Sequence, residues 1–389
     1  MVLSRDEGRS QTHRRIRRFL AWSRGDPVSE DALYLGRAYE LAARGIGSTS
    51  PNPPVGAVVV KDGHTLAEAF HRKRGETHAE SEALRLAGKG AAGATLYVSL
   101  EPCDHTGLTP PCTRAAVEAG IARVVVGVAD PNPRTNGAGI HRLREAGIRV
   151  DIVNDDRAKQ LIAAFAVSIA LDRPFVTLKM AASLDGCVAP RPGSSWLTGE
   201  TSRGFVRRLR TEHDAVMVGG GTVSVDDPSL TVRPPHARRV PYVRACICDG
   251  RPVATDRRIF SPAKGYATTM VLAAGQRRHF GQLDAVANVI YVGEETAAAV
   301  DVRAALVTMK ERGISSVLCE GGPRLAARLL SADVVDRVEW LVAPVFFGTA
   351  EAVRSLDGAR GLDRQRWQIV AQERLGEDLR LSLRPVPGA

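Results

Sequence analysis

Apolar residues in the first half of the chain recur at two spacings, one helical and one alternating. From Ser29 to Gly45 the spacing is helical, and Ser29 is suited to cap the first turn. Two apolar runs at 55–60 and 66–70 flank an Asp62-Gly63 turn and predict a β-hairpin. Further strands are predicted at 95–99, 123–128 and 148–153, with helices at 82–88, at 112–120 and ending at Gly147. This β-β-α-β-α-β-α-β order predicts one sheet covered by helices on both faces.

A second α/β pattern follows a linking helix that is predicted at 155–171. Its strands are apolar runs, and the segments between them have helical periodicity. We expect strands at 175–180, 215–218, 245–248, 290–292 and 316–319, and helices at 200–211, 296–312 and 323–330. The sequence therefore predicts two domains, residues 29–173 and 174–389, which meet near Arg173-Pro174 and are preceded by a separate tail at residues 1–28.

Composition supports two soluble globular domains. At 389 residues the chain is longer than one core usually serves, and 44% hydrophobic with 25% charged residues is ordinary for globular proteins. No apolar run approaches the ~18 residues of a membrane span, so we expect no membrane partner. Six cysteines without a signal peptide argue against a disulfide framework and favour a reducing compartment, which is the cytoplasm.

The net charge of +10 overstates the basic character of the two domains. Residues 1–24 hold seven arginines against Asp6 and Glu7, a balance of +5, so half of the excess lies in the tail. Such a tail could be a nucleic-acid-binding arm or an organelle-targeting leader, although the two acidic residues weaken the second alternative. We favour a disordered extension or a start codon placed too early.

Three short motifs carry candidate chemistry: His78-Ala79-Glu80, Pro102-Cys103 and Pro111-Cys112. One imidazole and two thiolates make three zinc ligands and leave a fourth position open for water. Glu80, two residues from the histidine, is placed to move the protons of that water as general acid and base. The combination indicates a hydrolytic deaminase with zinc as cofactor and Glu80 as catalytic residue.

The spacing of these motifs also locates the metal. Residues two apart on a helix do not share a face, so His78 and Glu80 converge on one metal only at the N-terminal end of the helix that they begin. Cys112 opens a second helix, where exposed N–H groups and the helix dipole favour its thiolate. Eight residues separate the two cysteines, whereas the usual zinc-deaminase signature has two.

A closed structural zinc site is the alternative interpretation of the same ligands. It requires a fourth ligand, for which His71 and His105 are candidates, but it leaves Glu80 without a purpose. The other four cysteines lie in apolar or strand-like surroundings and are expected to be buried small hydrophobic residues without chemistry: Cys187, Cys246, Cys248 and Cys319.

Two glycine clusters in the second half, Gly219-Gly220-Gly221 and Gly321-Gly322, lack the spacing of a dinucleotide fingerprint. From the residues alone, each is a strand-to-helix turn that could hold a phosphate at a helix N-terminus. The pattern by itself leaves a nucleotide-binding role open.

Several longer motifs follow one another in a characteristic order. In the first half they are Pro51 to Val59, His71, Thr77 to Glu80, Glu101 to Cys112 and Asp130 to Pro133. In the second half they are Leu178 to Gly186, Ser194 to Gly199, Val218 to Thr222, Asp226 to Leu230 and Glu320 to Pro323. Over residues 30–385 this set resembles the bifunctional riboflavin-biosynthesis deaminase-reductase family. The resemblance implies a cytidine-deaminase-like α/β/α zinc domain followed by a dihydrofolate-reductase-like α/β domain.

The resemblance also implies roles for single residues. NADPH is expected at Ala181, Trp196, Thr222, Asp226 and the turn that begins with Gly322, Pro323 and Arg324. The implied substrate-binding residues of the deaminase half are Asn52, His71, His105 and Asn132. Those of the reductase half are Lys179, Ser194, Arg210, Leu230, Arg233 and Glu320.

The implied substrate is a small-molecule pyrimidine ribosyl phosphate. It is first deaminated, and its ribosyl group is then reduced by NADPH to a ribityl group. Arg210 and Arg233 offer forked donors for its phosphate, which a neutral pocket would not provide. The resemblance further implies a homo-oligomer, either a dimer or a tetramer.

This chain departs from the family pattern at Leu108, where a basic residue that helps to hold the substrate phosphate usually follows the glycine. Candidates to compensate are Arg72, Lys73, Arg74 and Arg134. Ile162 in place of a usual asparagine, and the unusual segment 248–253, are expected to be packing variation.

A different class of function stays as an alternative. A zinc deaminase acting on nucleic acid or a nucleoside, with a non-catalytic C-terminal domain, would suit the basic tail. The rest of the chain shows no basic stripe interleaved with aromatic residues, so we expect no nucleic-acid partner.

Overall fold

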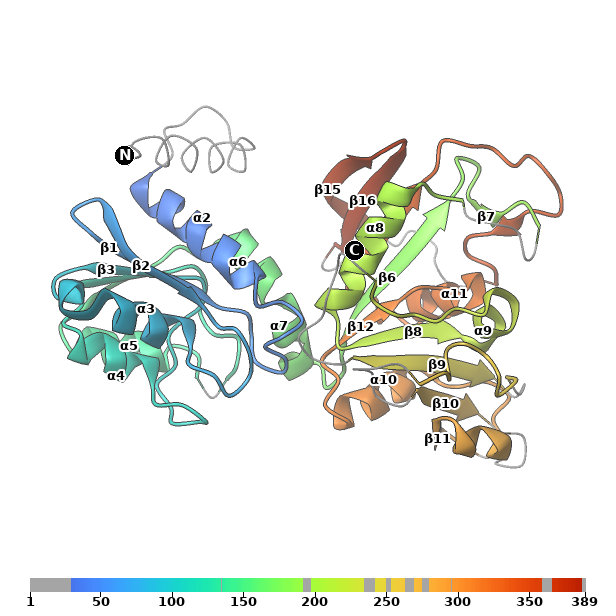
Figure 1. The fold of residues 1–389 in the computed structure, drawn as a ribbon, viewed down its shortest axis with the longest axis horizontal. Helices are drawn as coiled ribbons and strands as arrows, with labels where there is room; N and C mark the ends of the chain where they lie inside the picture. The colour runs from blue at the N-terminus through green and yellow to red at the C-terminus, as the bar shows by residue number, and fades with distance from the viewer. Residues whose placement is uncertain are drawn as a thin grey trace, which may run out of the picture. The chain divides into compact units, whose positions relative to one another are not determined.

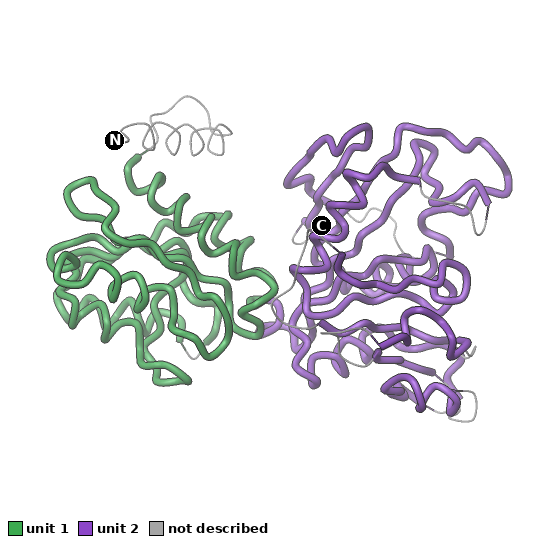
Figure 2. Tube along the Cα trace, viewed as in Figure 1, with its two compact units in different colours: residues 1–166 green, residues 167–389 purple. Residues whose placement is uncertain are grey.

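The computed structural model contains two compact units, residues 1–166 and residues 167–389 (Figure 2). The expected boundary at Arg173-Pro174 stays a prediction, and the predicted tail at 1–28 lies outside the described residues. No helix in the described part of the chain is long and apolar enough to cross a membrane. The structure describes residues 29–133, 135–191, 197–233, 242–249, 253–262, 269–274, 280–294, 296–358 and 366–386.

The first unit is built on a five-stranded sheet in the order β2-β1-β3-β4-β5. Its strands are β1 (Gly56–Lys61), β2 (His64–Phe70), β3 (Thr95–Val98), β4 (Arg123–Val126) and β5 (Arg149–Ile152). Its helices are α2 (Glu30–Ala43), α3 (Ala79–Ala87), α4 (Cys112–Glu118), α5 (Ala138–Glu145) and α6 (Asp156–Leu161), with a short 3₁₀ turn η1 (Gly88–Ala91). β1 pairs antiparallel with β2 and β3, whereas β3, β4 and β5 are parallel. Every element predicted between residues 29 and 153 is present.

Helices cover both faces of this sheet (Figure 1). α2 and α6 pack together on one face, and α3, α4 and α5 pack side by side on the other. The central strands are continuous apolar runs because both of their faces are buried. Val58 and Val59, successive residues that point to opposite faces of β1, are both fully buried. The predicted α/β/α layering is confirmed.

Helix α2 lies directly on the start of β1 because Gly56 has no side chain. A Cβ atom at Gly56 would lie 2.1 Å from the Ala38 carbonyl oxygen and 2.6 Å from the Ala42 backbone nitrogen. Such separations are far below van der Waals contact, so any side chain here would push the helix off the sheet.

The second unit is built on a nine-stranded sheet in the order β11-β10-β9-β8-β12-β6-β13-β16-β15. Its helices are α7 (Ala163–Ala170, which spans the division between the units), α8 (Glu200–Glu212), α9 (Gly220–Asp226), α10 (Val302–Glu311) and α11 (Pro323–Ser331), with a 3₁₀ turn η3 (Gly281–Ala285). The strands of the sheet are β6 (Phe175–Ala182), β8 (Ala215–Gly219), β9 (Val243–Asp249), β10 (Met270–Ala274), β11 (Asn288–Tyr291), β12 (Ser316–Cys319), β13 (Arg337–Val342), β15 (Trp367–Leu375) and β16 (Asp378–Pro385). Two short strands, β7 (Cys187–Ala189) and β14 (Val353–Arg354), pair separately.

Two hydrophobic cores lie on the two faces of this sheet. On β8, Ala215 and Met217 belong to one core, and Val216 and Val218 belong to the other, because successive side chains of a strand alternate. Helices α10 and α11 cover the first core, and α8 covers the second (Figure 1). The strands from β11 to β13 are parallel, so their carboxyl ends meet at one edge of the sheet.

The structure corrects two predicted helices and adds strands. The linking helix expected at 155–171 is divided at the buried Ile162 into α6 and α7. The helix expected at 296–312 begins only at Val302, because the Asp301 carboxylate caps it by accepting from the Arg303 N–H at 2.8 Å. The strands that were not predicted are β7, β10, β13, β14, β15 and β16.

We predict that Gly56→Ala lowers the free energy of unfolding by about 1–3 kcal/mol, because its Cβ overpacks the contact with α2. Urea unfolding followed by circular dichroism would measure the loss. Gly36→Ala within α2 is the matched control, because its nearest neighbouring atom would lie 3.9 Å away and alanine favours a helix. Equal unfolding midpoints for the two variants would show that the close packing of α2 on β1 is not needed.

Candidate active sites

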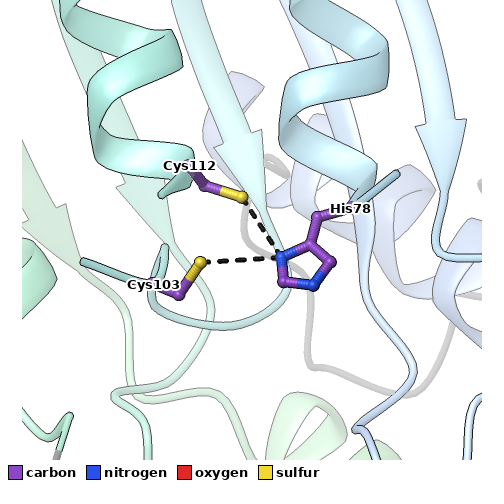
Figure 3. Close-up of side chains that lie close together, drawn as sticks. All are labelled: His78, Cys103 and Cys112. Atoms are coloured by element: carbon purple, nitrogen blue, oxygen red, sulfur yellow. Dashed lines mark hydrogen bonds between the residues drawn. The ribbon is translucent and has the colours of Figure 1, made fainter. Parts of the chain in front are cut away.

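Three candidate metal ligands come together in the first unit. His78 is the N-cap residue of α3, Cys112 is the first residue of α4, and Cys103 lies in the segment after β3. Their side chains point toward one another (Figure 3). The His78 Nδ1 atom lies 3.5 Å from Cys103 Sγ and 3.4 Å from Cys112 Sγ. The structure thus brings together the three residues that the sequence named as ligands, at the N-terminal ends of two helices.

The geometry of this cluster fits zinc. Tetrahedral zinc with Zn–S bonds of about 2.3 Å and Zn–N bonds of about 2.0 Å separates sulfur and nitrogen by about 3.5 Å. The two distances from His78 match that value, and all three ligand atoms lie within 4.8 Å of one another. Among the described residues the cluster contains three ligands, which is the number typical of catalytic zinc sites.

Glu80 lies in the first turn of α3 and is only 3% exposed. Burial raises the pKa of its carboxyl group to about 7, and the neighbouring Cys103 thiolate acts in the same direction. A carboxyl group with a pKa near neutrality can both accept and donate a proton at physiological pH. Its position and its pKa therefore suit a general acid and base beside the metal cluster.

The two cysteine ligands differ in acidity. A hydrogen bond from the Cys112 thiol, together with the nearby His78, lowers the pKa of Cys103 to about 4, and the same hydrogen bond and burial raise the pKa of Cys112. The Ser81 hydroxyl donates to Cys112 Sγ over 3.6 Å. A donor to a ligand sulfur orients it and stabilises its thiolate. Ser81 was not singled out from the sequence, because a serine inside a helix carries no distinctive signal.

His71 is buried beside the cluster, with its ring centroid 5.1 Å from that of His78. Its Nδ1 atom lies 3.3 Å from the Thr77 carbonyl oxygen, which can only accept, so Nδ1 carries the proton. Its Nε2 atom is then the acceptor for the Asn52 amide, 3.4 Å away. Burial also lowers the pKa of His71, as a neutral ring requires. Both nitrogens are engaged, so His71 is not placed to serve as a fourth zinc ligand.

His105, the other candidate for a closed site, is exposed in the loop between the cysteines and is not part of the ligand cluster. The arrangement of the described residues therefore favours the open, catalytic interpretation over the closed, structural one.

Glu101 anchors the segment that carries Cys103. Its carboxylate accepts hydrogen bonds of 3.0–3.2 Å from the backbone N–H groups of four residues: Asp130, Gly137, Gly139 and Ile140. The Asn132 N–H in turn donates to the Asp130 carboxylate at 2.9 Å. Glu101 thus connects the Cys103 segment to the loop of Asn132, a residue implied in substrate binding. No role for Glu101 itself was predictable from the sequence, because all four of its partners lie about thirty or more residues away.

A charged cluster lies at the expected reductase site of the second unit. Lys179 is on β6, Glu320 follows the neighbouring strand β12, and Arg210 is on α8. The Arg210 guanidinium holds both oxygens of Glu320, from Nε to Oε1 and from Nη2 to Oε2 at 2.7 Å. Its Nη1 group donates to the Thr231 carbonyl oxygen at 2.9 Å. The fork that we expected to hold the substrate phosphate is therefore engaged by Glu320 in this structure.

The charges of this cluster depend on one another. Burial lowers the pKa of Lys179, and the Glu320 carboxylate opposes that change. Burial alone would raise the pKa of Glu320, but the charges of Arg210 and Lys179 hold it below its usual value. Glu320 is thus an anion that pairs with Arg210 and lies close to Lys179.

The segment before β9 contains two further residues implied in substrate binding. Leu230 has a positive φ of +51° and a buried side chain, so only its backbone is available to a ligand. Its carbonyl oxygen accepts from the Tyr242 hydroxyl. Arg233 is exposed and donates to the Ser229 hydroxyl at 3.2 Å. Arg233 is therefore better placed than Arg210 to contact a phosphate.

Two glycine turns follow the strands β8 and β12 at the carboxyl edge of the sheet. Gly321 and Gly322 have φ values of +99° and +83°, which favour glycine. The Gly219 N–H donates to the Gly321 carbonyl oxygen at 3.4 Å, and a Cβ atom on Gly322 would lie 2.8 Å from Thr222 Oγ1. Helices α9 and α11 therefore begin close together, with their unpaired backbone N–H groups at the edge where α/β sheets bind nucleotides.

The structure gives less detail about the remaining residues that the resemblance implies in cofactor binding. Pro323 is the first residue of α11, and the exposed Arg324 pairs with Asp357 at 3.1 Å. Ala181 is partly buried near the end of β6, and Asp226 is exposed at the end of α9. Ser194 and Trp196 lie outside the described residues.

The four cysteines outside the metal cluster are all buried and free, as predicted from the sequence. Cys246 and Cys248 alternate with residues of the other core on β9, and their sulfur atoms lie 3.4 Å apart. They fill the core on the face covered by α8.

The fold and the first site define a zinc deaminase domain, which is followed by an α/β domain with a candidate nucleotide edge. The family of the cytidine and deoxycytidylate deaminase zinc-binding region matches residues 28–128. The RibD C-terminal domain family matches residues 174–381.

Similarity to curated proteins extends over nearly the whole chain. Riboflavin biosynthesis protein RibD of Aquifex aeolicus is 39% identical over 354 residues, which cover 90% of this chain and 97% of that protein. RibD of Escherichia coli is 36% identical over 382 residues, which cover 91% and 99%. Acinetobacter baumannii RibD has a solved structure with 34% identity and a TM-score of 0.79, covering 92% of this chain and 100% of that one. The chain belongs to the RibD family, the bifunctional deaminase-reductases of riboflavin biosynthesis.

We predict that the purified protein contains about one zinc ion per chain and that Cys103→Ala loses it, because two ligands do not hold zinc tightly. Elemental analysis by mass spectrometry after gel filtration would measure the zinc content. Cys187→Ala, which removes a cysteine outside the cluster, should keep its zinc. Undiminished zinc in Cys103→Ala would remove that residue from the ligand set.

Proposed function

We propose that the first unit deaminates 2,5-diamino-6-ribosylamino-4(3H)-pyrimidinone 5′-phosphate with zinc, and that the second unit reduces the ribosyl group of the product with NADPH. The product is then 5-amino-6-ribitylaminouracil 5′-phosphate. A Thermotoga maritima protein of solved structure, 34% identical with a TM-score of 0.75, is described as a diaminohydroxyphosphoribosylaminopyrimidine deaminase and 5-amino-6-(5-phosphoribosylamino)uracil reductase. The observation that carries the proposal is the buried Glu80 beside a three-ligand cluster.

In the deaminase site, His78, Cys103 and Cys112 would hold zinc. Bound zinc supplies a Lewis acid that makes water a nucleophile near neutral pH. Glu80 accepts one proton of the attacking water and delivers it to the ring nitrogen. It then carries the remaining proton of the added hydroxyl group to the amino group, which leaves as ammonia while the ring carbonyl forms. Burial supports both steps, because it raises the pKa of Glu80 to about 7. Asn52, whose amide donates to the buried His71 beside the cluster, is suited to contact the pyrimidine ring.

We predict that Glu80→Gln keeps zinc but slows deamination by roughly 10²–10⁴-fold, because an amide cannot transfer protons. Ammonia release would be measured with the phosphorylated substrate. Reduction of a substrate that has already been deaminated should be unaffected. Glu82→Gln is the matched control, since Glu82 lies in the same turn and pairs with Arg85. Near-normal ammonia release by Glu80→Gln would assign the proton transfer to another group.

In the reductase site, NADPH would lie along the edge formed by the Gly322 turn and Thr222, and it supplies the hydride that reduces C1′ of the opened ribosyl group. Lys179 lies on β6 and Glu320 directly follows the adjacent strand β12, so both are suited to orient the sugar hydroxyls. The Nε and Nη2 groups of Arg210 donate to the Glu320 carboxylate, and its Nη1 group donates to the Thr231 carbonyl oxygen. We therefore assign Arg210 mainly to positioning Glu320 and the segment before β9, and the phosphate mainly to Arg233.

We predict that Arg210→Lys lowers kcat/KM for NADPH-dependent reduction by roughly 10- to 150-fold, because lysine keeps the charge but cannot hold three acceptors at once. Deamination should not change, because Arg210 lies in the second unit. Arg208→Lys on the exposed side of the same helix is the control and should reduce substrate normally. An unaltered reduction rate for Arg210→Lys would contradict the positioning role.

The family relationship also supports a homo-oligomer, either a dimer or a tetramer, in the cytoplasm. Six free cysteines fit a reducing compartment. Nucleic acid is not a proposed partner, because the chain is similar to enzymes of riboflavin biosynthesis over both halves.

A further inference from the structure

The turn between β2 and α3 carries three consecutive cations, Arg72, Lys73 and Arg74, all of them exposed. A hydrogen bond of 3.1 Å from the Glu76 N–H to the Lys73 carbonyl oxygen closes the turn. His71 precedes the turn and His78 follows it, and their rings are 5.1 Å apart. The cations therefore lie at the rim of the metal cluster.

The same turn approaches the loop that connects the two cysteine ligands. A Cβ atom on Gly75 would lie 4.0 Å from Cδ1 of Leu108, whose side chain is 75% exposed. Leucine offers no charge to an anion, so positive charge at this junction has to come from the turn. Arg134, another candidate to supply it, lies outside the described residues.

The cations at this rim form no ion pairs with carboxylates in the described part of the chain, and neither does Arg44. The Arg44 and Arg72 guanidinium groups instead lie over the Phe70 ring, at 4.4 Å and 5.9 Å from its centroid. The nearby Glu82 carboxylate is already held by Arg85, with both contacts at 2.8 Å. Other arginines of the same unit do form ion pairs: Arg37, Arg85, Arg114, Arg123, Arg149 and Arg157.

Like charges on successive residues repel, and neighbouring carboxylates would normally relieve that repulsion. Leaving four cations unpaired around one rim keeps the local potential positive and attracts an anionic ligand to it. The Phe70 ring already orients the Arg44 and Arg72 guanidinium groups, so these side chains lose less conformational entropy when a ligand binds.

We propose that this cationic rim, made by Arg72, Lys73, Arg74 and Arg44, binds the phosphate group of the substrate of the deaminase site. The inference rests on the proposed function, because it assumes a pyrimidine that carries a phosphate. A phosphate dianion accepts several charge-assisted hydrogen bonds, and arginine forks match its geometry. The rim therefore selects phosphorylated over unphosphorylated substrates.

The test is a variant with glutamine at all three positions of the turn: Arg72→Gln, Lys73→Gln and Arg74→Gln. For the phosphorylated substrate, we expect KM for ammonia release to rise roughly 10- to 100-fold with little change in kcat. For the same substrate without its phosphate, KM should not change. Zinc content should equal that of the wild type.

The matched control removes the same charge from exposed positions elsewhere in the unit, through Lys89→Gln, Arg142→Gln and Arg149→Gln. Its KM values should stay at wild-type levels. An unchanged KM in the turn variant would overturn the proposal, because the turn would then not contact the substrate. An equal rise in KM for both forms of the substrate would also overturn it, because the effect would then not depend on the phosphate.

A binding measurement separates this proposal from the function on which it rests. Inorganic phosphate should bind more weakly to the turn variant than to the control variant, as followed by phosphorus NMR line width. If the wild type deaminated neither form of the substrate, the proposed function would fail, and the phosphate measurement would still decide whether the rim binds the anion. Equal phosphate binding by the two variants would reject the rim as an anion site.

Discussion

The meeting of two helix N-termini at one point is the constraint on which the deaminase unit depends. His78 caps α3 and Cys112 begins α4, and Cys103 completes the cluster from the segment after β3. A helix start favours a thiolate and lets residues two apart, His78 and Glu80, serve one centre. The sheet holds both helices in place, and Gly56 and Glu101 fix the segments around them through close backbone contacts.

The second unit uses the end of a parallel sheet for its own site. Strands β6, β8 and β12 are adjacent, so Lys179, Glu320 and the glycine turns lie near one edge although they are far apart in sequence. Arg210 adds a constraint from α8 by pairing with the Glu320 carboxylate. An anion and two cations in a partly buried cluster stabilise one another, and removing any one of them leaves the others unbalanced.

Motif spacing and helix-start signals in the sequence predicted the metal cluster, whereas contacts between residues far apart in the chain were not predictable. The motif spacing predicted His78, Cys103, Cys112 and Glu80 as one site, because His78 and Cys112 each stand at the start of a predicted helix. The pairing of Arg210 with Glu320 was not predictable in that way, since 110 residues separate them and the resemblance implies that both bind substrate. The strands β13, β15 and β16 were not predicted, although β16 alternates polar and apolar residues. The break at Ile162 is set by packing rather than by a local stop signal.

The central claim is that two independent sites in one chain act in sequence, deamination before reduction. One assay tests it directly, by following ammonia release and NADPH absorbance separately on the phosphorylated diaminopyrimidine. We predict full ammonia release without NADPH, and NADPH oxidation that begins after a lag and reaches about one equivalent per ammonia. NADPH oxidation without ammonia release, or ammonia release that requires NADPH, would contradict the account.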